Sequence, residues 1–304
     1  MLPPDNFDPE IGLAETLEPG LRRIVAPNPS PMTYRGTNTY LLGQSEVAVI
    51  DPGPDSPAHL DAILAALQPG QRISHIIVTH THLDHSPLAR PLAARTGAEV
   101  WAFGNATAGR SPVMQGLAEA GLMGGGEGVD HEFIPDHTLA DGDVLEGESW
   151  ALEVLHTPGH IGNHLCLAWG DACLTADHIM GWATSLVSPP DGDLTDFMTS
   201  CEKLAARQWR VFYPGHGAPV LDPNTRLDWL VAHRRAREAS ILEALNAGPA
   251  TAVDLARVIY TETPAALLGA ATRNVLAHLV DLTGRGRVAP RSVLHAEAHF
   301  ALTS

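Results

Sequence analysis

Six consecutive residues, His80-Thr81-His82-Leu83-Asp84-His85, form the densest group of metal-binding side chains in the sequence. Imidazole and carboxylate groups are ligands that zinc takes from proteins. The chain contains 16 histidines, so pairs arise by chance, but three imidazoles and one acid in this spacing are much rarer. We therefore interpret the run as part of a metal centre rather than as a solvated polar loop.

Further candidate ligands follow short apolar runs at three other places. His160 and His216 each come directly after a Pro-Gly pair, which predicts a tight turn from which the histidine projects. Asp177 lies just beyond the apolar run 172–175. Because loops at strand ends can direct side chains at one point, these residues could complete the centre.

The elements that position these residues are predicted from short apolar runs and turn residues. The run 73–78 is β-branched and predicts a buried strand directly before His80. Residues 56–67 have apolar side chains at helical spacing and predict a helix. The other predicted strands cover residues 39–42, 46–50, 100–103, 150–155, 164–169, 172–175 and 210–213. This mixture predicts an α/β or α+β fold with sheets covered by helices.

The order of these motifs resembles that of the metallo-β-lactamase superfamily. Asp51, which closes the run 46–50, matches its first motif, and the histidine-rich run, His160, Asp177 and His216 match the others in order. The resemblance covers roughly residues 20–220. It implies an αββα sandwich with the metal site at one edge of the paired sheets.

The same resemblance implies two metal ions and assigns their ligands. One ion would be held by His80, His82 and His160, and the other by Asp84, His85 and His216, with Asp177 bridging both. The expected ions are two Zn²⁺ per chain, with Mn²⁺ or Fe²⁺ as alternatives. Asp84 and Asp177 are the candidate catalytic acids. A hydroxide bridging the ions would attack a carbonyl or phosphoryl centre.

Weaker candidates lie beside these residues. Asp51 is expected to orient a ligand through hydrogen bonds, with an ordinary turn acid as the alternative. His178 could contact substrate or face outward as a polar residue. Met180 and Trp182 could line a pocket or pack in the core. Five glycines within residues 121–128 predict a mobile surface loop or lid.

The segment beyond residue 222 has a different character, so we expect a hydrolase domain over 1–222 and a second domain over 223–304. Predicted helices cover 225–245, 253–260 and 265–282, and residues 287–288 and 293–302 could form a two-stranded ribbon. This is the outline of a winged helix-turn-helix. It resembles the superfamily branch typified by lactamase-like protein 2, near glyoxalase II, in which a winged-helix-like domain follows the hydrolase.

Three functions are compatible with these features. The first is hydrolysis of a small ester, thioester or lactone, and the second is cleavage of single-stranded RNA. The third is a non-enzymatic interaction module with a metal-sensing core. The net charge is −16, and residues 223–304 carry nine arginines, no lysine and seven acids. So small a basic excess, with few aromatic residues beside it, favours a small-molecule substrate over a polyanion.

Composition narrows the choice further. No apolar run of 18 residues occurs, so no transmembrane helix is expected. Three cysteines without CxxC spacing and an N-terminus without a secretory pattern favour the cytoplasm, which disfavours a true β-lactamase. His82 stands where flavodiiron proteins usually have an acid. A mononuclear iron persulfide dioxygenase stays open, although Asp84 and His216 favour a second metal.

Overall fold

The computed structural model describes residues 6–303 and contains two large β-sheets. The first has seven strands in chain order, of which the first four pair antiparallel and the remainder parallel. Its strands are β1 (Glu15–Glu18), β2 (Leu21–Val25), β3 (Asn38–Leu42), β4 (Glu46–Ile50), β5 (Arg72–Ile77), β6 (Glu99–Ala102) and β7 (His137–Thr138). All the strands predicted for this sheet are present, within one residue of their expected bounds.

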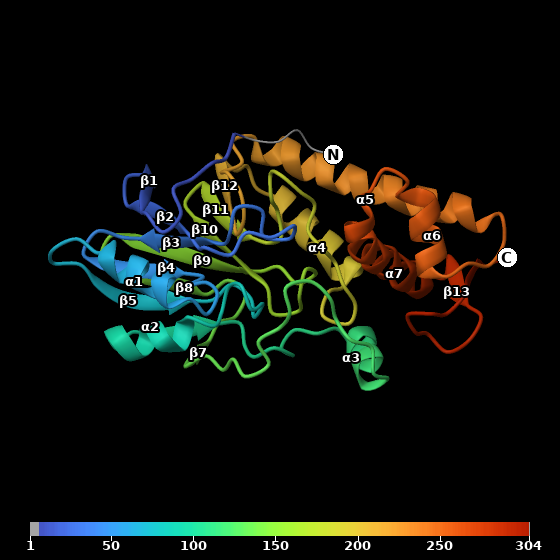
Figure 1. The fold of residues 1–304 in the computed structure, drawn as a ribbon, viewed down its shortest axis with the longest axis horizontal. Coiled ribbons are helices and arrows are strands. Elements are labelled where there is room, and N and C mark those ends of the chain that lie inside the picture. Colours follow the sequence, from blue (N-terminus) through green and yellow to red (C-terminus); the bar gives the residue numbers. More distant parts are fainter. Residues whose placement is uncertain (1–5, 304) are drawn as a thin grey trace.

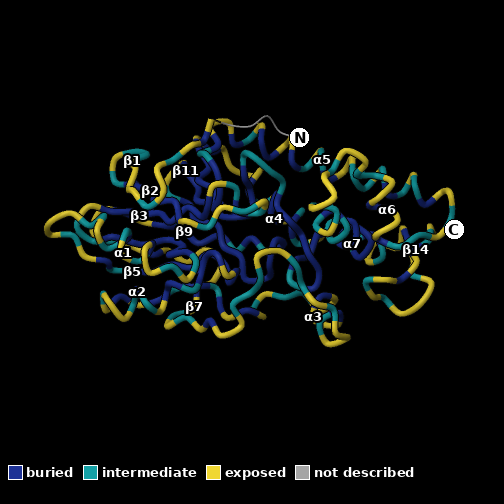
Figure 2. Tube along the Cα trace, in the orientation of Figure 1, coloured by how far each residue is buried: buried dark blue, intermediate teal, exposed yellow. Residues whose placement is uncertain are grey.

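The second sheet has five strands in the order β12-β11-β10-β9-β8. Only β11 and β12 pair parallel, and the other neighbours are antiparallel. Its strands are β8 (Val144–Gly147), β9 (Trp150–His156), β10 (Leu165–Trp169), β11 (Ala172–Ala176) and β12 (Val211–Pro214). The central strands of both sheets are buried along most of their length, as Figure 2 shows, whereas β1, β7 and β8 are more exposed.

The two sheets pack face to face, and helices cover their outer faces (Figure 1). One core joins residues of both sheets, such as Tyr40 and Leu167. A second core lies between the first sheet and the helices α1 (Pro57–Ala65) and α2 (Ala89–Thr96). A third lies between the second sheet and the helices α4 (Leu194–Ala205) and α5 (Pro223–Leu245). The predicted αββα sandwich is therefore confirmed.

Strands of both sheets end at one common edge. β4 and β5 run parallel, as do β11 and β12, and β9 shares the direction of β11 because both are antiparallel to β10. A bridge between Thr37 and His216 joins the loops of the two sheets at this edge. The loops that follow these five strands therefore converge, which places the motifs of the sequence together.

The C-terminal segment forms helices and a small ribbon at one end of the sandwich (Figure 1). Its elements after α5 are α6 (Ala252–Ile259), the 3-10 turn η1 (Ala265–Leu267), α7 (Leu268–Gly284), β13 (Val288–Pro290) and β14 (Phe300–Leu302). The ribbon is shorter than expected, because residues 293–299 form turns before the chain pairs with β13. α3 (Pro112–Glu119), from the loop region of the first sheet, packs into the core of this segment.

The long helix α5 belongs to two cores. Leu227 and Leu230, near its start, pack with the second sheet, whereas Ile241 and Leu245, near its end, pack with α6 and α7. A boundary at residue 222 stays a prediction, and α5 ties the two sides of it together. No helix among residues 6–303 is long and apolar enough to cross a bilayer.

Candidate metal centre

Seven buried histidine and aspartate side chains converge at the common edge of the two sheets. They form two groups, and within each group one ligand atom per residue lies within 4.8 Å of the others. The groups come from the loops after β5, β9, β11 and β12. They contain all seven residues that the sequence predicts as ligands: His80, His82 and His160 in one, and Asp84, His85, Asp177 and His216 in the other.

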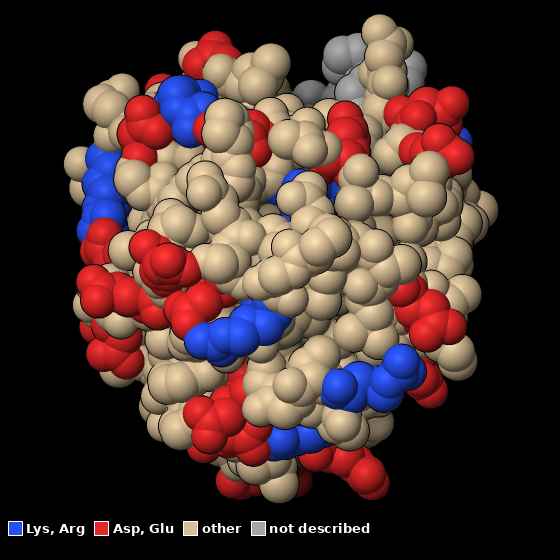
Figure 3. Space-filling model, turned by 90° about the vertical axis from the view of Figure 1, so that its left-hand side faces the viewer, with Lys and Arg blue, Asp and Glu red and all other residues tan. Residues whose placement is uncertain are grey.

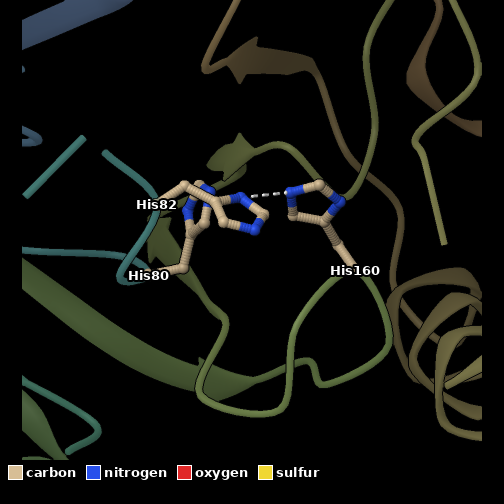
Figure 4. Close-up of side chains that lie close together, drawn as sticks. All are labelled: His80, His82 and His160. Carbon is tan, nitrogen blue, oxygen red and sulfur yellow. Dashed lines mark hydrogen bonds between the residues drawn. The ribbon is translucent and has the colours of Figure 1, made fainter. Parts of the chain in front are cut away.

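The first group, His80, His82 and His160, is called the histidine half-site below. Its rings face one another, and Nδ1 of His82 lies 2.9 Å from Nε2 of His160 (Figure 4). Burial lowers the pKa of each ring, to about 3 for His82, and neighbouring histidines lower the pKa of His80 further. All three imidazoles are therefore neutral at pH 7, with a lone pair available to a cation.

The second group, Asp84, His85, Asp177 and His216, is called the carboxylate half-site. Nε2 of His216 lies 3.1 Å from Asp84 Oδ2 and 3.3 Å from Asp177 Oδ2. Burial alone would lower the pKa of His85 and His216, but the carboxylates raise it, to about 10 for His216. Burial would likewise raise the pKa of Asp84 and Asp177, but the two histidines hold both below their usual range.

Asp177 reaches both half-sites. Its Oδ2 lies 3.6 Å from Nε2 of His160 and 3.3 Å from Nε2 of His216. The tight turn after β12 permits this approach, because a Cβ on Gly215 would stand 2.3 Å from Asp177 Oδ1 and 2.9 Å from His85 Cε1. A glycine is therefore required at position 215 for the carboxylate to lie between the two groups.

Asp51 lies behind the cluster rather than in it. Its Oδ1 accepts a hydrogen bond from the Thr79 amide at 2.8 Å, and its Oδ2 accepts from Thr79 Oγ1 at 2.8 Å and from His85 Nδ1 at 3.0 Å. Asp51 lies close enough to His80 and His85 to form a third potential ligand group. Since hydrogen bonds already use both of its oxygens, we interpret Asp51 as orienting His85, as the sequence led us to expect.

Backbone carbonyls orient two other histidines. Nδ1 of His160 donates to the Leu186 carbonyl at 2.7 Å, and Nδ1 of His216 donates to the Gly36 carbonyl at 3.2 Å. A carbonyl can only accept, so each Nδ1 carries a proton. The pKa of His160 is lowered, so its Nε2 presents a lone pair to the centre, whereas the pKa of His216 is raised, so its Nε2 does so only after releasing a proton.

His178 does not reach the site. Its ring is buried beneath the cluster, 4.3 Å from the Phe197 ring centroid and with Nε2 3.6 Å from the Cys201 thiol. His178 therefore neither lies where substrate could contact it nor faces outward, because the turn after β11 directs its side chain into the core. The ring of His164 is also buried, with its centroid 5.1 Å from that of the His80 ring.

A pocket of about 250 Å³ opens directly over the cluster. Met180 and Trp182 line the pocket, as one of the two interpretations of the sequence predicted. Gly125 and Gly126, from the glycine-rich segment, also line it. The C-terminal segment supplies a further part of the wall. The lining residues from that segment are Tyr260, Thr263, Leu267, Ala270, Ala271 and Asn274.

Comparison with protein families and known proteins agrees with this architecture. A model described as the metallo-beta-lactamase superfamily matches residues 32–238, and a beta-lactamase associated winged helix domain matches residues 251–292. The chain is 33% identical over 282 residues to the beta-lactamase-like protein 2 homolog of Drosophila melanogaster, covering 88% of each chain. It is 28% identical over 277 residues to an atrochrysone carboxyl ACP thioesterase of Aspergillus fumigatus, covering 84% of this chain and 78% of that one.

Solved structures show the same fold over nearly the whole chain. A metallo-beta-lactamase family protein from Thermus thermophilus superposes with a TM-score of 0.76 at 26% identity, covering 95% of this chain and all of that one. A beta-lactamase domain protein from Burkholderia ambifaria superposes with a TM-score of 0.80 at 22% identity, covering 99% of this chain and 97% of that one. Both the sandwich and the C-terminal segment therefore have counterparts.

Proposed function

Because the chain belongs to the metallo-beta-lactamase superfamily and has the fold of its hydrolases, we propose that it hydrolyses a small ester or thioester with two divalent metal ions. The observation that carries this proposal is the pair of half-sites beneath one pocket. A lactone is an internal ester and falls in the same substrate class.

The donor atoms of the cluster fit two metal ions. Four of its buried polar atoms have no hydrogen-bond partner among the residues described. They are His80 Nε2, Asp84 Oδ1, His85 Nε2 and Asp177 Oδ1. Burying polar atoms without hydrogen bonds costs free energy, whereas two cations, one in each half-site, would coordinate all four atoms.

We assign the ligands by half-site. His80, His82 and His160 would hold one ion and Asp84, His85 and His216 the other, with Asp177 shared by both. Zinc suits this mixture of imidazole and carboxylate, and Mn²⁺ or Fe²⁺ are alternatives. When bound, such ions lower the pKa of water and polarise the oxygen that gains charge.

The protein's own residues would complete the chemistry. Asp84 and Asp177, both ionised because their pKa values are lowered, would offset the charge of the ions and accept a hydrogen bond from the attacking water. His85 and His216 are fixed from behind by Asp51 and by the Gly36 carbonyl. The burial of the cluster excludes bulk water and strengthens these interactions.

The pocket favours an uncharged acyl group. Its lining contains Met32, Met180, Trp182, Leu186 and Leu267 but no lysine or arginine among the described residues. The protein from Aspergillus fumigatus is named as an acyl-carrier-protein thioesterase, which agrees with an acyl substrate here.

Two arginines of the C-terminal segment that could have bound RNA are engaged with other parts of the chain. Arg273 donates to the Met123, Gly124 and Pro189 carbonyls, and Arg285 pairs with Glu238 and Asp281. On the end of the molecule that carries β1 and α1, isolated basic side chains lie among acidic ones (Figure 3). These observations favour a small molecule over a polyanion.

A substrate panel tests the proposal. The zinc-loaded protein is mixed with acyl thioesters, aryl esters, lactones, an aryl phosphodiester and single-stranded RNA, with His82→Ala as the blank. We expect thioester or ester hydrolysis, followed by thiol or acid release, that the blank lacks. Cleavage of RNA or the phosphodiester alone would overturn the substrate class, and no hydrolysis of any compound would overturn the proposal.

A further inference from the structure

The segment between β11 and α4, residues 177–193, is called the ligand loop below. It begins at Asp177, has no regular secondary structure, and is buried over most of its length. Buried backbone without helix or strand partners must find hydrogen bonds elsewhere. Here several of the partners are side chains of the C-terminal segment, a long way along the chain.

One peptide unit of this loop contacts both a metal ligand and the C-terminal segment. The carbonyl of Leu186 accepts the hydrogen bond from His160 Nδ1 at 2.7 Å. The adjoining amide of Val187 donates to Oδ1 of Asn274, on α7, at 3.1 Å. The C=O and N–H of one peptide share a rigid plane. The Asn274 hydrogen bond therefore fixes the direction in which the carbonyl meets His160.

Asn274 is itself held by Arg234, a buried residue of α5. Arg234 Nη1 donates to Asn274 Oδ1 at 2.9 Å, and its Nη2 donates to the Ser185 carbonyl. The guanidinium lies 5.0 Å from the centroid of the Phe197 ring. One guanidinium thus orients the amide and fixes the neighbouring peptide of the loop.

Ser185 extends the same network toward the second half-site. Its hydroxyl contacts the carbonyls of both Asp177 and His178, the latter at 2.7 Å. Arg226, near the start of α5, holds the intervening loop through the Met180 carbonyl at 2.7 Å and the Ala183 carbonyl at 2.6 Å.

We propose that Arg234 and Asn274 are positioning residues of the metal centre, acting through the ligand loop on His160 and Asp177. The inference rests on the proposed function, because it takes these two residues as metal ligands. Both half-sites then depend on the C-terminal segment. The same segment supplies part of the pocket wall. The hydrogen bonds described here give it a part in holding the metals as well.

Asn274→Ala in the full chain is the first test, with Co²⁺ as the probe. It removes the acceptor for both Val187 and Arg234. We expect about 10- to 100-fold weaker binding of the first Co²⁺ and an altered visible absorption spectrum. Asn274→Asp keeps an oxygen acceptor for both donors and should restore the spectrum. Arg234→Met, which keeps the buried stem, should reproduce the altered spectrum and serves if Asn274→Ala does not fold.

Thr195→Val is the matched control. The Thr195 hydroxyl donates to Asp281 at 2.8 Å, which joins α4 to α7 without touching the ligand loop. This variant should lower the free energy of unfolding, because a hydrogen bond between α4 and α7 is lost, but it should keep the wild-type cobalt spectrum. Unchanged Co²⁺ affinity and spectrum in Asn274→Ala, or in Arg234→Met if the former is unfolded, would overturn the inference alone. A wild-type protein that binds no Co²⁺ would instead overturn the proposed function.

Discussion

The two half-sites lie in one buried cluster, yet their electrostatics are opposite. In the histidine half-site, burial and neighbouring rings lower the pKa of His80 and His82. In the carboxylate half-site, the acids raise the pKa of His85 and His216 despite equal burial. Without metal at pH 7, the first is a set of neutral donors and the second a set of ion pairs.

This difference shows that desolvation and pairing determine what a histidine can do. A neutral imidazole can bind a cation without losing a proton, whereas a protonated one must release it first. In the proposed centre, the histidine half-site would therefore bind metal without losing protons, and the carboxylate half-site would bind metal by exchanging protons for it. The two ions should differ in affinity, in pH dependence and in their response to substitution.

The largest expected effect comes from removing a ligand of the carboxylate half-site. His216→Ala should retain one metal ion per chain but lower kcat by about 10³-fold, because one source of charge stabilisation is lost. Asp84→Ala should behave alike. Elemental analysis of the purified variants and kinetics on the best ester or thioester check this. A variant that keeps full activity with one metal would show that the carboxylate half-site is dispensable.

The second prediction concerns proton release. His85 and His216 carry protons at pH 7 in the metal-free protein, since their pKa values are raised, to about 10 for the latter. Binding of the second metal should release about two protons, and binding of the first about none. Below pH 7 the second affinity should fall about 100-fold per pH unit. Calorimetric titrations in buffers of different ionisation enthalpy measure both numbers. Release of equal numbers of protons on binding the two ions would contradict the proposed electrostatic difference between the half-sites.

A smaller effect is expected at Asp51. Asp51→Asn removes the charge behind His85 and should weaken the second metal by about 10- to 100-fold, with less effect on the first. Competition with a chromophoric chelator measures both affinities. Asp130→Asn is a suitable control, because Asp130 accepts from Ser86 at 3.1 Å beside the same loop but is not bonded to any of the proposed ligands. Equal losses of metal affinity in the two variants would show a general loosening of the loop and would contradict a specific role of Asp51 behind His85.

Much of the fold around the site could be predicted because its strands are short apolar runs closed by turns. β4 matched its predicted bounds, and β9 to β12 were within one residue. β2 was not predicted, since Arg22 and Arg23 interrupt its apolar pattern. Both arginines are buried through distant partners, Arg22 with Gln71 at 3.0 Å and Arg23 with Glu15. Local sequence does not reveal such partners.

The residues of the site likewise fall into those that the sequence predicts and those that it does not. Its seven candidate ligands could be named because each follows a strand or a Pro-Gly turn, and their role as ligands stays a prediction. The supporting residues could not. Val187 and Asn274 are 87 positions apart, and Thr37, whose hydroxyl lies 3.4 Å from Asp84, carries no signal of its own. Such contacts depend on how the two sheets and the C-terminal segment meet.

The most direct test of the account is anomalous diffraction at the zinc edge from crystals grown with zinc at pH 8. Two peaks are predicted, one beside His80, His82 and His160 and one beside Asp84, His85 and His216, with Asp177 contacting both. A second crystal at pH 6 should lose the latter peak first. A single peak at pH 8, or loss of the histidine half-site's peak first, would contradict the central claim.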